Sequence, residues 1–129
     1  MYLLDPIDDE TGRALREAAS ANGDLRVLIA SDLDEKGRFG RQWLMVTSEA
    51  VHVLAGDDGN TRVVRSYPLA EIEEARTQPL VGGGQIELIV AGVPTPLIRY
   101  SNSAAPRFSE AARGIQQTAR GEAFAVKTR

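Results

Sequence analysis

Residues 38–67 read RFGRQWLMVTSEAVHVLAGDDGNTRVVRSY, and this stretch decides the fold. It holds three apolar runs that are typical of β-strands, Arg38–Thr47, Val51–Leu54 and Arg62–Tyr67. The two connections between these runs are short. The second connection, Asp57-Asp58-Gly59-Asn60, is a strong hairpin signal because Gly and Asn accept positive φ. The stretch therefore predicts a meander of antiparallel strands.

The β pattern continues on both sides of this stretch. Before it, Leu25, Val27 and Ile29 alternate with their neighbours, and the acidic stretch 32–37 ends in glycine and predicts a turn. After it, Pro68 ends the meander, and two glycine-containing bends separate the runs that follow. These runs predict three more strands, near Ile72–Thr77, over Gln85–Ala91 and over Thr95–Tyr100.

A helix is predicted at each end of the β region. After Ser103, apolar residues recur at intervals of three and four, which indicates a helix with one buried face that ends near Gly121. Its expected buried residues are Ala105, Phe108, Ala112, Ile115 and Ala119. At the front, Asp5 and Pro6 predict a helix start and Gly23 its end. The thin apolar stripe of this front helix suits a peripheral position, with Ile7, Leu15, Ala18 and Ala19 as its members.

Composition limits the class of protein. The 129 residues suit one domain, with a helical extension over 1–23, the β domain over 24–121 and a tail or linker over 122–129. With no Cys, the chain has no disulfides and no cysteine nucleophile. The net charge of −3 argues against general nucleic-acid binding, which needs a concentrated basic face. The first residues have neither a basic region nor a long apolar run, so we expect no secretory signal and no transmembrane helix there.

Four groups of residues carry a resemblance to a known family. They are GRFGRQWLMVT at 37–47, YPLAEIE at 67–73, VGGG at 81–84, and RYS at 99–101 with APRF at 105–108. In order and spacing they resemble the pleckstrin-homology-like segment at the cytoplasmic N-terminus of certain bacterial ABC exporters. These exporters fuse permease and ATPase in one polypeptide. The resemblance covers about residues 24–120.

The resemblance implies a fold and a role. The fold is mainly β, a pleckstrin-homology-like antiparallel barrel or sandwich capped by the C-terminal helix. The role is that of a non-catalytic regulatory or docking domain of an ABC transporter, in the cytoplasm at the inner face of the cell membrane. Its partner would be another protein or the cytoplasmic parts of the parent transporter, and membrane attachment would come through the parent polypeptide. Neither a cofactor nor a nucleic acid is expected as a ligand.

Lys36, Arg38 and Arg41 are the candidate contacts for an anion or a protein partner. Lipid-binding pleckstrin-homology domains place basic residues at the corresponding first hairpin, where several cations hold a phosphate headgroup. Acids in the same turn weaken such a site unless they pair with these bases, and they are Asp32, Asp34 and Glu35. Local ion pairing is therefore the alternative role for the three bases.

The other residues capable of chemistry favour structural roles. The triplet Gly82-Gly83-Gly84 matches no phosphate-binding pattern and leads into a strand, so a bend or bulge is expected. His52 lies in an apolar strand and is the only His, which leaves no set of metal ligands around it. We expect Glu71, Glu73 and Glu74 on a solvated surface or in ion pairs. The sequence thus predicts no catalytic, cofactor-binding or metal-binding residue.

Two alternatives to protein docking remain at this point. One is a peripheral module that binds anionic phospholipid through the basic turn, and the other is a small-ligand-binding barrel that uses its mouth. Three basic residues near an anionic membrane contribute about 3 kcal/mol, but the neighbouring acids and the net negative charge oppose them. Weak vesicle binding is therefore expected. Trp43 and Phe108 are predicted to be buried anchors of the fold.

Overall fold

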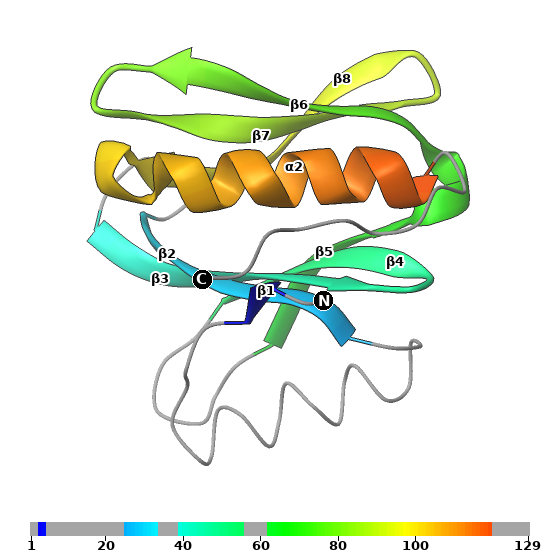
Figure 1. The fold of residues 1–129 in the computed structure, drawn as a ribbon, viewed down its shortest axis with the longest axis horizontal. Helices are drawn as coiled ribbons and strands as arrows, with labels where there is room; N and C mark the ends of the chain where they lie inside the picture. Colours follow the sequence, from blue (N-terminus) through cyan, green and yellow to red (C-terminus); the bar gives the residue numbers. More distant parts are fainter. Residues whose placement is uncertain (1–2, 5–24, 34–38, 56–61, 120–129) are drawn as a thin grey trace.

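In the part of the chain that the structure describes, the fold has two β-sheets and one α-helix between their open edges (Figure 1). The structure is a computed structural model, and it describes residues 3–4, 25–33, 39–55 and 62–119. The first sheet, sheet A, has the strand order β1-β2-β3-β4-β5, and the second, sheet B, has the order β6-β7-β8. The mainly β fold with a C-terminal helix is therefore confirmed.

Sheet A contains the meander that the sequence predicts. Its strands are β1 (Leu3–Leu4), β2 (Leu25–Leu33), β3 (Phe39–Thr47), β4 (Ala50–Ala55) and β5 (Arg62–Pro68). Strands β2 to β5 pair antiparallel in chain order, whereas β1 pairs parallel with β2. At the tight turn between β3 and β4, the Thr47 hydroxyl accepts a hydrogen bond from the Ala50 amide at 3.1 Å. The chain thus joins the edge of sheet A at Leu3, ahead of the predicted front helix.

Sheet B is a second antiparallel meander. A single 3-10 turn, η1 (Leu69–Glu71), leads from sheet A into β6 (Ile72–Leu80), β7 (Gly83–Val90) and β8 (Val93–Ser101). The β6–β7 and β7–β8 connections are both two residues long by their registers. The second of them, Ala91-Gly92, has positive φ at both residues, as the right-handed twist of a two-residue hairpin requires.

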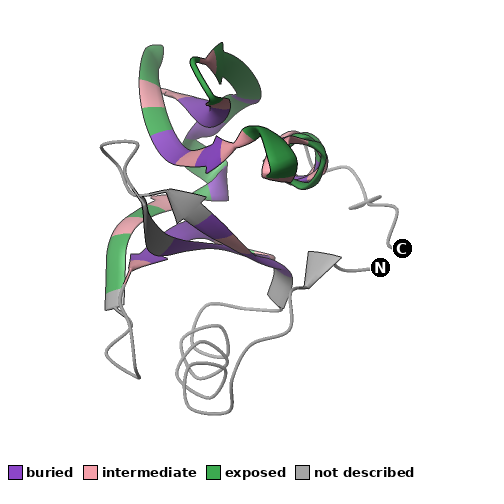
Figure 2. Cartoon of the chain, turned by 90° about the vertical axis from the view of Figure 1, so that its left-hand side faces the viewer, coloured by how far each residue is buried: buried purple, intermediate pink, exposed green. Residues whose placement is uncertain are grey.

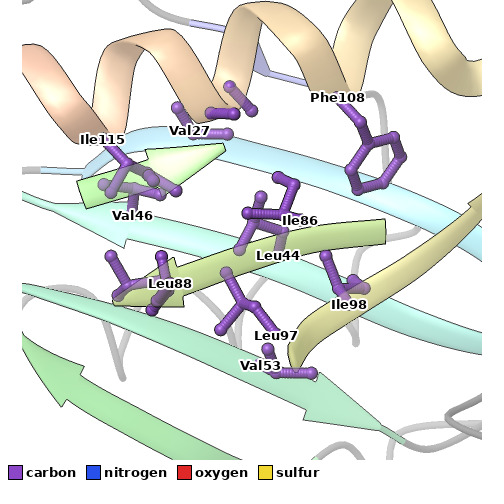
Figure 3. Packing of buried hydrophobic residues seen from close by; sticks show 14 of the residues in the cluster. Val27, Leu44, Val46, Val53, Ile86, Leu88, Leu97, Ile98, Phe108 and Ile115 are labelled. Carbon is purple, nitrogen blue, oxygen red and sulfur yellow. The ribbon is translucent and has the colours of Figure 1, made fainter. Parts of the chain in front are cut away.

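The helix α2 (Ala105–Ala119) follows the 3-10 turn η2 (Asn102–Ala104) and packs mainly against β6. Figure 2 shows the buried residues gathered between the two sheets and along the inner side of α2. In Figure 3, side chains from both sheets and from the helix meet in one cluster. Its fully buried members include Val27, Ile29, Leu44, Ile86, Leu88, Phe108 and Ile115. The predicted buried face of the helix is confirmed at Phe108, Ala112 and Ile115.

Of the two forms expected, a barrel or a sandwich, the part of the chain that the structure describes does not form a closed barrel. Strand β8 lies beside β2, but no backbone ladder joins the two sheets there. Pro94 and Pro96 give a physical reason, because proline lacks the N–H that a ladder needs and is confined to edge strands. The expected helix at 5–23 and the tail at 122–129 lie outside the described residues.

Candidate interaction surface

The predicted basic turn falls at the border of the described chain. Lys36 and Arg38 lie outside the described residues, and Arg41 belongs to β3 without a described side chain. The structure therefore neither brings the three bases together nor separates them. Their role as anion or partner contacts stays a prediction.

The glycine triplet has the structural role that the sequence indicates. Val81 and Gly82 form the tight turn between β6 and β7, and Gly82 has a φ of 80°. A Cβ on Gly83 would lie 2.0 Å from the carbonyl oxygen of Tyr100, and one on Gly84 would lie 2.7 Å from the Tyr100 hydroxyl. Glycine is therefore needed because β8 and the Tyr100 ring approach the β7 backbone closely.

The glutamates at the start of sheet B are exposed, as expected. Glu73 Oε1 accepts a hydrogen bond from the Gly92 amide at 3.1 Å, which ties β6 to the β7–β8 turn. Across the same sheet, Arg76 donates to Glu87 Oε1 at 2.6 and 2.9 Å, and this hydrogen bond raises the pKa of the Arg76 guanidinium. Within the described residues, no group of three His, Cys, Asp or Glu could hold a metal ion.

Strand β5 is the free border of sheet A. It pairs with β4 on one side and has no neighbouring strand on the other among the described elements. Two adjacent valines lie on it with substantial exposure, Val63 at 46% and Val64 at 39%. Val64 is the extra residue of a bulge, since Val53 and Leu54 pair with Arg65 and Val63. An edge strand with exposed apolar side chains offers its backbone groups and its valines together to another extended chain.

The outer face of sheet A, which points away from sheet B, carries two rows of directly opposed residues. One row is Leu28, Met45, His52 and Ser66, and the other is Ala30, Trp43, Leu54 and Val63. Leu28, Met45, Trp43 and Leu54 form a buried cluster separate from the main core. The members of both rows on β2, β3 and β4 are buried, except the partly buried Ala30, and each row becomes exposed at its β5 member. The expected burial of Trp43 is confirmed, but in this second cluster.

His52 is a buried member of the first row. Its Nδ1 lies 2.7 Å from the hydroxyl oxygen of Ser66, and its Nε2 is buried and has no hydrogen-bond partner among the described residues. Burial lowers the pKa of His52 below its ordinary value of 6.5, because a charged imidazolium here would lose its hydration. The prediction of a structural role agrees with this setting, and neutral His52 is the form that the fold favours.

Acidification is expected to destabilise the protein through His52. Because the folded-state pKa is lowered, the unfolded chain binds more protons once the pH falls below about 6.5, and stability is lost there by at most about 1.4 kcal/mol per pH unit. Urea unfolding at pH 7.5 and 5.5 measures this loss. The His52→Gln variant should lose less stability over the same interval, since it has no imidazole to protonate. An equal loss in the two proteins would contradict the prediction.

Polar side chains of sheet A hold the edge of β8. The Ser31 hydroxyl donates to the carbonyl oxygen of Arg99, and Arg65 Nη2 donates to that of Leu97 at 2.9 Å. Leu97 is the extra residue of a bulge in β8, so side chains take over where the ladder with β7 is interrupted. The sequence pattern alone does not predict this contact between sheet A and β8. The one signal for this contact in the sequence is that Ser31 and Arg65 are polar residues at positions that face the core side of sheet A.

Comparison with protein-family models and with curated proteins found no match to this chain. No helix in the described ranges is both long and apolar enough to cross a membrane.

Proposed function

We propose that this chain is a non-catalytic docking domain that contacts proteins through the free edge of β5. The observation that carries the proposal is a strand edge that has no neighbouring strand among the described elements, with two exposed valines on that strand. The other exposed valines of the described chain, Val81 and Val93, lie at or beside the tight turns of sheet B. A peptide adding to β5 would gain backbone hydrogen bonds and contacts with Val63 and Val64.

The bulge at Val64 supports pairing of β5 with a specific partner rather than with any exposed strand. Natural edge strands avoid aggregation through bulges, short length and charged residues. Here β5 is seven residues long, contains the bulge, and ends in Pro68, which has no N–H to offer. A partner segment therefore has to match an interrupted edge, which favours a specific partner over another exposed strand.

The wider setting that we propose is the cytoplasmic N-terminal region of a bacterial ABC exporter. Its support is the resemblance in the sequence, together with an order of elements that agrees with it: two β meanders and then one helix. The partner would then be a cytoplasmic part of the same transporter. The reading frame after Arg129 tests this setting directly. Membrane spans followed by a phosphate-binding loop would support it, and their absence would overturn it.

Binding through β5 is tested by paired valine variants. Residues 1–129 and the remaining cytoplasmic parts of the parent are produced separately and titrated by calorimetry. Val63→Lys with Val64→Lys should weaken binding about tenfold or more, because lysine on an edge disfavours strand addition. The control, Val81→Lys with Val93→Lys, adds the same charge to sheet B and should change affinity by less than about twofold.

The outcomes separate the alternatives. Equal binding by the edge variant and the wild type would exclude β5 as the contact. Co-sedimentation with anionic phospholipid vesicles, abolished when Lys36, Arg38 and Arg41 are all changed to alanine, would instead favour the lipid-binding module. Saturable binding of Mg·ATP by residues 1–129 would contradict the proposed non-catalytic role.

A further inference from the structure

The outer face of sheet B, opposite the side that packs against α2 and sheet A, carries an apolar group near the β7–β8 turn. Ile89 lies between Leu88 and Val90, which both pack on the core side, so its side chain points outward. Pro94 is directly opposite Ile89, and Pro96 lies two residues further along β8 on the same side. Both prolines are exposed, and Ile89 is partly buried. We call Ile89, Pro94 and Pro96 the proline face.

The proline face is ordered before any partner binds. Each proline ring fixes its own φ, and β8 is paired with β7 along this stretch. Glu87, which is directly opposite Pro96, is only 8% exposed and accepts hydrogen bonds from Arg76 at 2.6 and 2.9 Å. A surface whose side chains are already held in place loses little conformational entropy on binding. The proline face is therefore suited to contact with a partner.

The two prolines indicate how a partner would bind. Pro94 and Pro96 have no N–H, so this stretch of β8 is a poor template for an added strand. A partner therefore has to contact side chains rather than the backbone. Exposed prolines are bound by aromatic side chains, which pack against the apolar face of the pyrrolidine ring. The partner that fits the proline face presents an aromatic ring.

The charges beside the proline face favour a basic partner. Glu74 is directly opposite Ile89 on β6 and is exposed, and Glu73 next to it is exposed as well. Arg76, the base in the neighbouring outward row, already donates to Glu87. The surface around Ile89 is therefore negatively charged, and a cation on the partner would complement it.

We propose that the proline face docks a second protein partner, through a segment in which an aromatic residue is flanked by Lys or Arg. The aromatic ring would pack on the two prolines and Ile89, and the flanking cation would lie beside Glu74. The β5 border belongs to sheet A, whereas the proline face belongs to sheet B and points away from sheet A. This inference therefore does not depend on docking at β5, and either contact can fail without the other.

The test is an NMR titration of residues 1–129 with short peptides of defined chemistry. The probe is N-acetyl-Lys-Trp-Lys-amide, and it should shift the signals of Ile89 saturably with a Kd on the order of 1 mM. The matched controls are N-acetyl-Glu-Trp-Glu-amide, which reverses the charge, and N-acetyl-Lys-Ala-Lys-amide, which lacks the ring. Both should bind at least about fivefold more weakly. No saturable shift at Ile89 with the probe, or equal binding of either control peptide, would overturn the inference.

Variants of the protein complete the test. Glu74→Lys should weaken binding of the probe about threefold or more, because it reverses the charge beside the proline face. The matched control, Glu49→Lys, makes the same change in net charge at an exposed residue of the β3–β4 turn and should change the Kd by less than about twofold. Pro94→Thr with Pro96→Thr should abolish the shift at the proline face, while the amide signal of Leu88 reports whether sheet B stays folded. Unchanged binding by Glu74→Lys, or by the folded double variant, would overturn the inference.

Discussion

Replacing Phe108 by alanine is expected to lower the free energy of unfolding by about 3–5 kcal/mol. Phe108 is 1% exposed and belongs to the cluster in which α2 meets both sheets. Its ring stacks on that of Tyr100 with centroids 4.7 Å apart and an angle of 7° between the planes. Alanine would therefore remove buried area and leave a cavity that the stacked neighbour cannot fill without moving.

Urea unfolding followed by circular dichroism measures the effect of Phe108→Ala. Ser109→Ala is the matched control, because Ser109 is the next residue of α2 and is exposed, so its change should stay within about 0.5 kcal/mol. A loss below about 1 kcal/mol for Phe108→Ala would mean that the ring is not an anchor of the core. That result would contradict the packing of α2 between the two sheets.

The sequence predicts the elements well where one periodicity dominates. Apolar spacing after Ser103 predicts the helix, and α2 begins at Ala105 and ends at Ala119. The sequence predicts the strand after the glycine triplet at Gln85–Ala91, whereas β7 is Gly83–Val90. Glycine normally argues against a strand interior, but here the close approach of Tyr100 selects it. Tertiary packing therefore decides this boundary.

The division into two sheets could not be predicted from local pattern. It depends on which strand edges pair, and on side chains such as Arg65 that hold β8 without a ladder. The covered outer face did leave a signal. Trp43, Leu44, Met45 and Val46 are four consecutive apolar residues in β3, a pattern typical of a strand buried on both faces. The candidate basic turn remains untested because its side chains are outside the described residues.

Replacing Trp43 by alanine is the second substitution with a large expected effect, about 3–5 kcal/mol. Trp43 is the largest member of the outer-face cluster, and its neighbours in the row are Ala30, Leu54 and Val63. The matched control is Val63→Ala at the exposed end of the same row, which should cost no more than about 0.5 kcal/mol. Circular dichroism is the suitable probe, since the variant lacks the only tryptophan.

The losses of stability from Trp43→Ala and Phe108→Ala can be compared in the double variant. The two residues belong to separate buried clusters on opposite faces of sheet A, so their effects should be nearly additive in the double variant, within about 0.5 kcal/mol. A large loss from Trp43→Ala would mean that the outer face contributes as much to stability as the core between the sheets. A loss no larger than that of Val63→Ala would mean that the outer face is open to water in solution. Sheet A would then present its whole outer face, and not only the β5 border, to a partner.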